Sequence, residues 1–286
     1  MPLSELRIRE REVTTVRGLK VAIKGAGEMA SGIAHRLYRA NIRQIVMADI
    51  ERPLCVRRTV SFCEALFEGT FVVEGVTAET ADDIRGIVAA WERGHIGVMV
   101  DPSGSIIKGI KPDVVVDAIM AKKPTQTRPH EARLVIGVGP GFRAPEDVHV
   151  VVESNRGHDL GRLIYEGQAE PVTGVPGTTA GYGPERVLRA PHAGRVKHVR
   201  SLGDSVEKGE VVLFVEKTPV CAEISGILRG LIRDIDVVAN EKVGDIEPRG
   251  ESVDWHTISD KARAIGGAVL EAIMGEFNVS NASGER

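Results

Sequence analysis

Residues 19–32 read LKVAIKGAGEMASG, and this stretch decides how the first half of the chain folds. The apolar run 19–24 has the length of a buried strand, and a glycine turn leads from it directly into a helical pattern over 29–39. In this setting Gly25-x-Gly27-x-x-Ala30 is typical of a dinucleotide-binding turn, in which the glycines allow a tight turn and close approach of a pyrophosphate. We therefore predict a nucleotide-binding loop formed by Gly25, Ala26, Gly27, Glu28 and Ala30.

Two acidic residues bear on this prediction in opposite directions. Asp49 ends the apolar run 44–49, where a carboxylate would accept hydrogen bonds from ribose hydroxyls. The carboxylate of Glu28 would repel bound phosphates unless a cation or a neutral ligand intervenes; without a ligand it complements the helix dipole. Nucleotide binding is the favoured interpretation, and glycines that serve packing alone are the alternative.

The first half of the chain alternates short β-branched runs with helical patterns, which predicts a parallel sheet joined by helical crossovers. After the first strand we expect strands over 44–49, 70–73, 97–100, 114–116, 134–138 and 148–153, and helices over 56–67 and 81–91. In the helix over 56–67, Val60, Cys63, Leu66 and Phe67 would share one face. The predicted fold class is thus α/β, with an N-terminal extension (1–18) and a Rossmann-like nucleotide-binding domain (19–170).

Further candidates follow the later strands, whose carboxyl ends are expected to face one crevice. Gly139 and Gly141 form a second glycine-rich element, which could equally be a simple chain reversal. Arg156 could clamp a phosphate.

An acid or base would come from Asp101, Glu153 or His158, which the sequence does not rank, and His158 could equally cap a carbonyl. The sequence contains no Ser-His-Asp order, Walker lysine loop or His-x-x-x-His pair. It therefore lacks the motifs that would indicate a hydrolase, a phosphotransferase or a zinc enzyme, and no metal site is predicted.

The pattern changes after a glycine- and proline-rich linker or site loop (171–185). Residues 190–196 and 203–210 resemble the turns of biotinyl and lipoyl barrels, and 224–228 echo the first of them. We predict a small pseudo-symmetric lipoyl-like β barrel (barrel-sandwich hybrid) over 186–250, then a C-terminal helix and tail (251–286), the helix starting at Ser259 or Asp260. A carrier role is disfavoured because Pro219 stands where a carrier lysine belongs, and only Lys217 lies near the turn.

Composition excludes several classes of partner. The 286 residues include 37 basic and 40 acidic side chains, a formal net charge of -3, and 4% aromatic residues. The charge balance favours binding of neither nucleic acid nor an anionic membrane. The low aromatic content argues against a surface on which the bases of single-stranded nucleic acid would stack. With no signal peptide or membrane-spanning run, we expect the cytoplasm. Cys55, Cys63 and Cys221 form no Cys-x-x-Cys pair and are expected to be reduced thiols.

Motifs spread over roughly residues 19–277 resemble the YqeB family, accessory proteins of the selenium-dependent molybdenum hydroxylase system. They are KGAGEMASG (24–32), PLCVRRTVSF (53–62), VDAIMAK (116–122), GPGF (139–142), ESNRGHDLG (153–161), LRGL (228–231), DIEPR (245–249) and ISDKA (258–262). So many separated matches make a chance resemblance improbable.

The resemblance implies a role in maturing or inserting the molybdenum cofactor, in company with a molybdenum hydroxylase or other maturation proteins such as the XdhC type. The expected ligand is a molybdopterin dinucleotide or another nucleotide-bearing small molecule. The resemblance supplies no catalytic residue, so whether the protein is an enzyme stays open. The rival hypotheses are an NAD(P)-dependent oxidoreductase, supported by Asp49 and weakened by Glu28, and a protein-docking scaffold.

Overall fold

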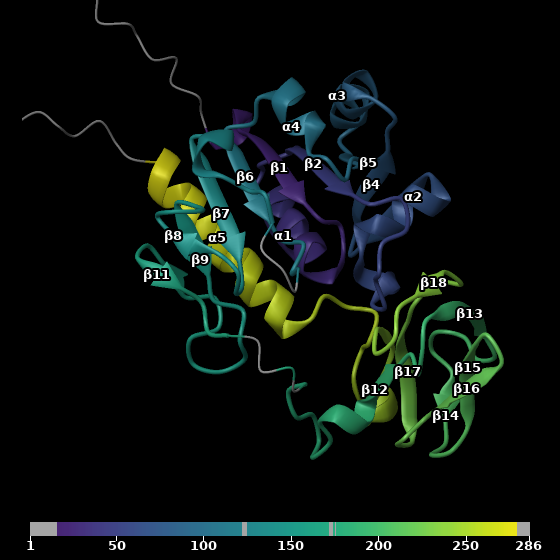
Figure 1. The fold of residues 1–286 in the computed structure, drawn as a ribbon. Coiled ribbons are helices and arrows are strands. Elements are labelled where there is room, and N and C mark those ends of the chain that lie inside the picture. Colours follow the sequence, from purple (N-terminus) through teal and green to yellow (C-terminus); the bar gives the residue numbers. More distant parts are fainter. Residues whose placement is uncertain (1–15, 122–124, 172–173, 175, 279–286) are drawn as a thin grey trace, which may run out of the picture.

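The computed structural model describes residues 16–121, 125–171, 174 and 176–278. Figure 1 shows two lobes: a larger one built on a nine-stranded sheet, and a smaller one of antiparallel strands. The chain passes from the larger lobe to the smaller one and then returns, so that its last helix, α5 (Asp260–Phe277), lies on the larger lobe. Both ends of the described chain therefore belong to the same lobe.

The nine-stranded sheet has the order β10-β9-β7-β6-β1-β2-β5-β4-β3. Its parallel strands are β1 (Lys20–Lys24), β2 (Gln44–Asp49), β4 (Val76–Thr80), β5 (Ile96–Val100), β6 (Val114–Asp117), β7 (Leu134–Val138) and β9 (Val150–Val152), and its antiparallel edges are β3 (Thr70–Val73) and β10 (Leu163–Ile164). The predicted mixed α/β fold with a large parallel sheet is confirmed. The run β5-β2-β1-β6-β7-β9 has the 3-2-1-4-5-6 order of doubly wound sheets, in which ligands bind where the order reverses, here between β1 and β6.

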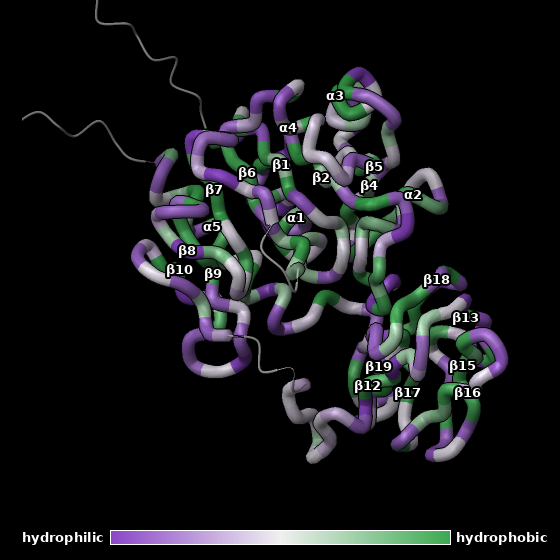
Figure 2. The backbone as a smooth tube through the Cα atoms, viewed as in Figure 1, coloured by the Kyte–Doolittle hydropathy of each residue, from purple (hydrophilic) through white to green (hydrophobic). Residues whose placement is uncertain are grey.

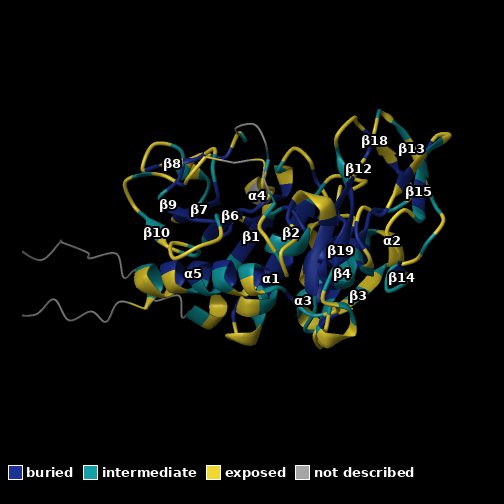
Figure 3. Cartoon of the chain, turned by 90° about the horizontal axis from the view of Figure 1, so that it is seen from below, coloured by how far each residue is buried: buried dark blue, intermediate teal, exposed yellow. Residues whose placement is uncertain are grey.

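Helices cover both faces of this sheet. α1 (Glu28–Arg39) and α5 lie on one face, while α3 (Ile84–Glu92) and α4 (Ser105–Ile110) lie on the other. Within β1, Val21 and Ile23 enter the core under α1 and α5, and Ala22 enters the opposite core. Burial on both faces explains why the strands are apolar runs without alternation, as the hydrophobic strand interiors in Figure 2 and the buried strands in Figure 3 show.

The helix predicted over 56–67 is wrong. The chain forms two 3₁₀ turns, Arg58–Val60 and Phe62–Glu64, and a single α-helical turn, α2 (Ala65–Glu68). A continuous helix is prevented because neighbouring elements use the backbone groups: the Phe62 N–H donates to Ser31 Oγ at 2.7 Å, and the Cys63 N–H donates to the Ala26 carbonyl at 2.9 Å. Cys63 is fully buried, whereas Phe67 is exposed.

α1 and α5 approach each other closely because glycines line their contact. A Cβ on Gly32 would lie 2.7 Å from Ala262 Cβ, and one on Gly266 would lie 2.9 Å from the Gly32 carbonyl oxygen. Both distances are shorter than the contacts that Cβ atoms make in proteins, so a side chain at either position would force the helices apart. The small side chains therefore set the spacing of the two helices.

The smaller lobe contains two four-stranded antiparallel sheets, β12-β19-β17-β14 and β16-β15-β13-β18, around one core that includes Leu213, Leu228 and Ile246. The strands are β12 (Val187–Arg189), β13 (Gly194–His198), β14 (Ser205–Val206), β15 (Val211–Val215), β16 (Thr218–Cys221), β17 (Gly226–Leu231), β18 (Asp236–Val237) and β19 (Lys242–Glu247). The strand pairing is the same in both sheets. In one sheet β19 pairs with β12 and β17, and in the other β15 pairs in the same way with β16 and β13. Lys217 lies in the exposed turn between β15 and β16. A short pair, β8 (Arg143–Ala144) with β11 (Gly167–Gln168), flanks the larger lobe.

The segment after β2 joins the lobes. Val56 belongs to the core of the smaller lobe, and its carbonyl accepts the Leu231 N–H at 2.8 Å. Arg233 pairs with Glu64 at 2.7 Å, and its guanidinium lies 4.2 Å from the centre of the Phe67 ring. This cation–π contact lies on one face of the Phe67 ring, and the residue stays 37% exposed.

Two neighbouring glycines of α5 test the helix contact. We expect Gly266→Ala to lower the free energy of unfolding by about 1–3 kcal/mol, because its Cβ meets the backbone of α1. Gly267→Ala, whose Cβ would lie more than 4 Å from every residue in the described ranges beyond its neighbours in the helix, should instead raise the free energy of unfolding by about 1 kcal/mol through helix propensity. Urea unfolding of both variants measures the difference, and equal effects of the two would contradict the close contact.

Candidate functional site

The glycine loop connects β1 to α1 at the point where the strand order reverses. Gly25 has φ +94°, and its Cβ position lies 3.2 Å from the Ala118 carbonyl oxygen, so both backbone conformation and space require glycine. Gly27 precedes the first residue of α1 and provides no side-chain cap. Among the described residues, nothing beyond its chain neighbours lies within 4 Å of a Cβ at Gly27, so the space at this position beside the helix start is open. Ala30 is fully buried and packs the helix on the sheet, as predicted.

Neighbouring elements hold the glycine loop in place. The Gly25 N–H donates to the Ala48 carbonyl at 2.7 Å, and the Ala26 carbonyl accepts both the Cys63 N–H at 2.9 Å and the Ser31 hydroxyl at 3.0 Å. These bonds come from β2, from the segment after it and from α1. The loop is therefore fixed before any ligand binds.

Asp49 contributes to the same arrangement. Its Oδ2 accepts the Ala26 N–H at 2.6 Å and its Oδ1 accepts the Ile50 N–H at 2.8 Å. Burial raises the pKa of Asp49, an effect that these two hydrogen bonds oppose. Each carboxylate oxygen has a second lone pair. Asp49 thus positions the loop and retains acceptor capacity for a further donor.

A cation stands beside Glu28. The Arg57 Nε lies 3.8 Å from Glu28 Oε1, and the Arg57 side chain is only 4% exposed. The Arg57 Nη2 also donates to the Thr257 carbonyl at 3.0 Å. Arg57 therefore meets the condition under which Glu28 is compatible with a bound phosphate. Arg57 was not among the predicted site residues. The feature of the sequence that could have indicated it is the pair of adjacent arginines inside a segment otherwise expected to be buried.

A buried polar cluster at the ends of β1 and β6 also escaped the sequence analysis. Asp117 Oδ2 accepts the hydroxyls of Thr125 at 2.7 Å and Thr127 at 2.6 Å. Lys24 donates to the Thr127 hydroxyl at 2.7 Å and pairs with Glu131 at 2.7 Å. The cluster ties the segment after β6 to the end of β1, beside Gly25. Its signal was a charged residue at the end of each apolar strand, Lys24 and Asp117.

Gly139 and Glu153 have structural partners of their own. The Cβ position of Gly139 lies 2.7 Å from Ser154 Oγ, so the glycine allows close packing of the loops after β7 and β9. Glu153 is almost fully buried and accepts the N–H groups of Ser154 and Asn155, each at 2.6 Å, and of Glu170 at 2.8 Å. Gly141 has φ +103° and open space around its Cβ position.

Of the remaining candidates, Asp101 and Arg156 have side-chain partners outside the glycine loop, although the Asp101 N–H donates to the Asp49 carbonyl at 2.9 Å. Asp101 accepts the Ile106 N–H at 2.6 Å and the hydroxyls of Ser103 and Ser105, and so caps α4. His158 is exposed on the loop after β9. Arg156 forms two hydrogen bonds with Asp260 at the start of α5, 2.6 and 3.1 Å long, which bring it to the space between the lobes.

The fold and this loop define a mixed α/β protein with a glycine turn at the reversal point of a parallel sheet. No family model matches the chain. It is 48% identical over 255 residues to YqeB of Escherichia coli (strain K12), described there as an uncharacterized protein; the match covers 89% of this chain and 47% of that protein. The identity supports membership of the YqeB family, and the chain spans about half the length of that relative.

Solved structures give weaker likenesses. The ectoine utilization protein EutE (DoeB) of Ruegeria pomeroyi, in its apo form, has a TM-score of 0.23 and 10% identity over 79% of this chain and 85% of that one. An aspartoacylase family protein of Mesorhizobium loti has a TM-score of 0.24 and 12% identity over 80% of this chain and 84% of that one. At these scores neither likeness supports a conclusion about fold or chemistry.

Two further observations concern the described residues alone. They contain no group of three or more His, Cys, Asp or Glu side chains arranged to hold a metal ion. None of the helices described combines the length and the apolar character that crossing a membrane requires.

Asp101 gives a pH-dependent test of its capping role. Burial alone would raise the pKa of Asp101, but hydrogen bonds from Ile106, Ser103 and Ser105 outweigh it and hold the pKa below its ordinary 3.8. This stabilisation is present above pH 3.8 and is lost as the pH falls through the lowered pKa. We expect Asp101→Asn to cost about 1 kcal/mol at neutral pH, a difference that narrows in acid.

Urea unfolding between pH 7 and pH 3 measures this difference, with the exposed Asp82→Asn as the matched control. A difference between wild type and Asp101→Asn that stays constant over this range would refute the charge-dependent cap.

Proposed function

We propose that the protein binds a nucleotide-bearing ligand at the glycine loop and acts as an accessory factor in maturing or inserting the molybdenum cofactor of selenium-dependent molybdenum hydroxylases. The observation that carries the binding proposal is the open space at Gly27, before the uncapped start of α1 and at the reversal point of the sheet. Phosphates bind at such helix starts because the first N–H groups have no intrahelical acceptor.

The surroundings of the loop support an anionic ligand. The first backbone bond of α1 runs from the Ser31 N–H to the Gly27 carbonyl, so the N–H groups of Glu28, Met29 and Ala30 have no acceptor within the helix. Arg57 offsets the charge of Glu28. The loop itself needs no rearrangement, which lowers the cost of binding.

The molybdenum role rests on the family resemblance. A molybdopterin dinucleotide is the proposed ligand, and a molybdenum hydroxylase or another maturation protein is the proposed partner, in the cytoplasm. We further propose that the smaller lobe is a lipoyl-like barrel that serves as a docking or lid element. The repeated strand pairing around a single core supports that assignment.

Two rival functions predict different behaviour. An NAD(P)-dependent oxidoreductase is favoured by Asp49 at the end of β2, whose oxygens can accept ribose hydroxyls as well as the Ala26 N–H. A protein-docking scaffold would use the glycine loop for packing alone. Hydride transfer to a substrate on addition of NAD would decide for the oxidoreductase, and the absence of any nucleotide or pterin affinity would decide for the scaffold.

Gly27→Trp separates these functions. Because no described residue beyond its chain neighbours lies within 4 Å of the Cβ position of Gly27, we expect the variant to fold with wild-type stability within about 1 kcal/mol while its indole fills the open space. Calorimetric titration with a molybdopterin dinucleotide, CTP and NAD should show selective binding of the pterin dinucleotide to the wild type and at least a tenfold loss in the variant.

Gly275→Trp, at the far end of α5, is the matched control and should bind like the wild type, because its Cβ position also has no described residue within 4 Å beyond its neighbours in the helix. Binding of NAD alone would move the protein to the oxidoreductase class. If a folded Gly27→Trp variant bound the pterin dinucleotide as tightly as the wild type, the ligand would not bind at the glycine loop.

A further inference from the structure

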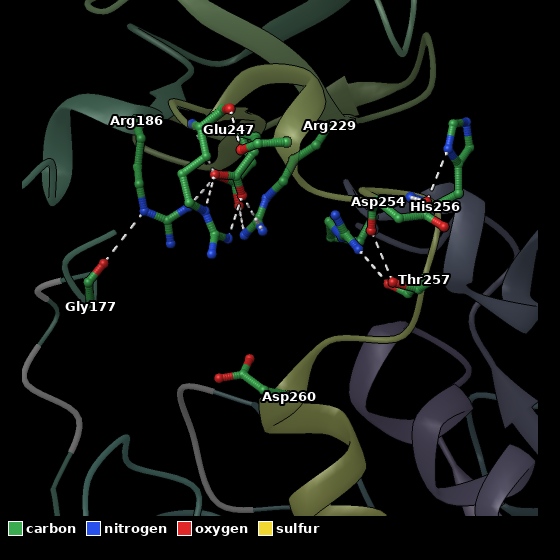
Figure 4. Close-up of polar contacts among 12 residues, drawn as sticks. Gly177, Arg186, Arg229, Glu247, Asp254, His256, Thr257 and Asp260 are labelled. Atoms are coloured by element: carbon green, nitrogen blue, oxygen red, sulfur yellow. Dashed lines mark hydrogen bonds and ion pairs between the residues drawn. The ribbon is translucent and has the colours of Figure 1, made fainter. Parts of the chain in front are cut away.

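A cleft of about 510 Å³ lies between the two lobes. Four arginines line it: Arg57 and Arg156 from the larger lobe, and Arg229 and Arg249 from the smaller one. The remaining walls are residues 178–180 and the connection 253–260 that leads into α5. We call this space the arginine cleft. In Figure 4, Arg229, which pairs with Glu247, faces it from one side and Asp260 from the other.

Cations outnumber carboxylates around the arginine cleft. Four arginines line it, against the two carboxylates of Asp254 and Asp260. Behind its wall, Glu247 is shared by Arg229 and Arg249, while Asp245 is shared by Arg186, Arg229 and Lys242. Each of these two buried carboxylates thus faces more than one cation. The protein's own acidic groups leave an excess of positive charge facing the cleft.

Arg57 is the most unusual of the four, because it is buried and only partly paired. Its Nη2 donates to Thr257, but its Nε and Nη1 have no hydrogen-bond acceptor among the described residues, and the Arg229 Nε is in the same condition. Buried charged donors without acceptors are costly. Burial lowers the pKa of Arg57. The negative charge of Glu28 raises this pKa in part, and the positive charge of Arg229 lowers it further. The Arg57 Nε and Nη1 and the Arg229 Nε each expose less than 1 Å² to solvent, so an anion in the cleft would offset the charge of the two guanidinium groups without contacting these atoms.

The end of the cleft formed by α5 adds a favourable field. The cleft includes Ser259, the residue that caps this 18-residue helix, and its hydroxyl accepts the Ala262 N–H at 3.3 Å. The positive end of the helix dipole therefore faces the same space as the guanidinium groups. Asp260 at this end is held by Arg156, which lowers the pKa of Asp260.

We propose that the arginine cleft binds the phosphate or diphosphate group of a small organic molecule, with its four arginines supplying the positive charge. Guanidinium groups approach from both lobes, an arrangement that suits an oxyanion with acceptors on several sides better than a single planar carboxylate. The cleft volume falls in the range of sites for organic ligands, so the anion is expected to carry an organic group. The lining residues do not include the glycine loop, but Arg57 adjoins both sites, because it lines the cleft and its Nε lies 3.8 Å from Glu28 Oε1.

Calorimetric titration of the full chain with inorganic pyrophosphate tests the proposal, with inorganic phosphate and malonate as comparison anions. We expect the cleft to bind one pyrophosphate per chain. Inorganic phosphate should bind with lower affinity than pyrophosphate, and malonate with the lowest affinity of the three. Arg57→Gln and Arg156→Gln should each weaken pyrophosphate about tenfold or more, the loss expected from a charge-assisted hydrogen bond. Arg156 is 44% exposed, so its variant reports on binding even where Arg57→Gln fails to fold.

Two controls separate this site from general charge and from the glycine loop. Arg162→Gln removes an exposed arginine of the same loop as Arg156 that does not line the cleft, and Gly27→Trp fills the glycine loop. Arg162→Gln should keep wild-type pyrophosphate affinity, and Gly27→Trp should keep the binding at the cleft while losing any second pyrophosphate bound at the glycine loop. In Arg162→Gln and the wild type, Trp255, which lines the cleft, should change its fluorescence on binding. No pyrophosphate binding, tighter binding of malonate, or equal losses in Arg156→Gln and Arg162→Gln would each overturn the proposal.

Discussion

The close contact between α1 and α5 is the constraint on which the rest of the arrangement depends. Because Gly32 and Gly266 let the two helices approach, the last helix of the chain covers the same sheet face as the first. The start of α5 is thereby fixed near the carboxyl end of the sheet, and it carries Ser259 and Asp260 with it. The connection 253–258 must then cross from the smaller lobe beside Arg57, whose Nη2 it meets through the Thr257 carbonyl.

The segment 55–64 performs a second joining task. It begins in the core of the smaller lobe at Val56 and ends against the glycine loop, where the Cys63 N–H reaches Ala26. Its irregular course results from these obligations, since each hydrogen bond to a neighbour is one that a helix would need for itself. Arg57 lies in the middle of this segment. One short stretch of chain thus connects the glycine loop, the arginine cleft and the smaller lobe.

Much of the larger lobe could be predicted from the sequence, because buried parallel strands are apolar runs and the glycine turn marks where the first of them ends. The 44–49 strand and the helix start at Ser259 were found at their positions. The 56–67 helix was wrongly predicted because its apolar spacing suits a helix, while the contacts that replace the helix come from distant residues. Arg57 and the arginine cleft could not be foreseen, since they require 57, 156, 229 and 249 to converge from two lobes. The sequence pattern does reveal the repeat in the smaller lobe, and its strand pairings show the same repeat.

The order in which the chain visits the two lobes limits how they can move. The strands of the smaller lobe, 187–247, are inserted between the nine-stranded sheet and the sheet's own final covering helix. The smaller lobe is therefore tethered at both of its ends, and residues 56 and 231 add a third attachment through a backbone hydrogen bond. A unit held in this way cannot swing freely about a single linker. These three attachments restrict separation of the lobes more strongly than one linker would.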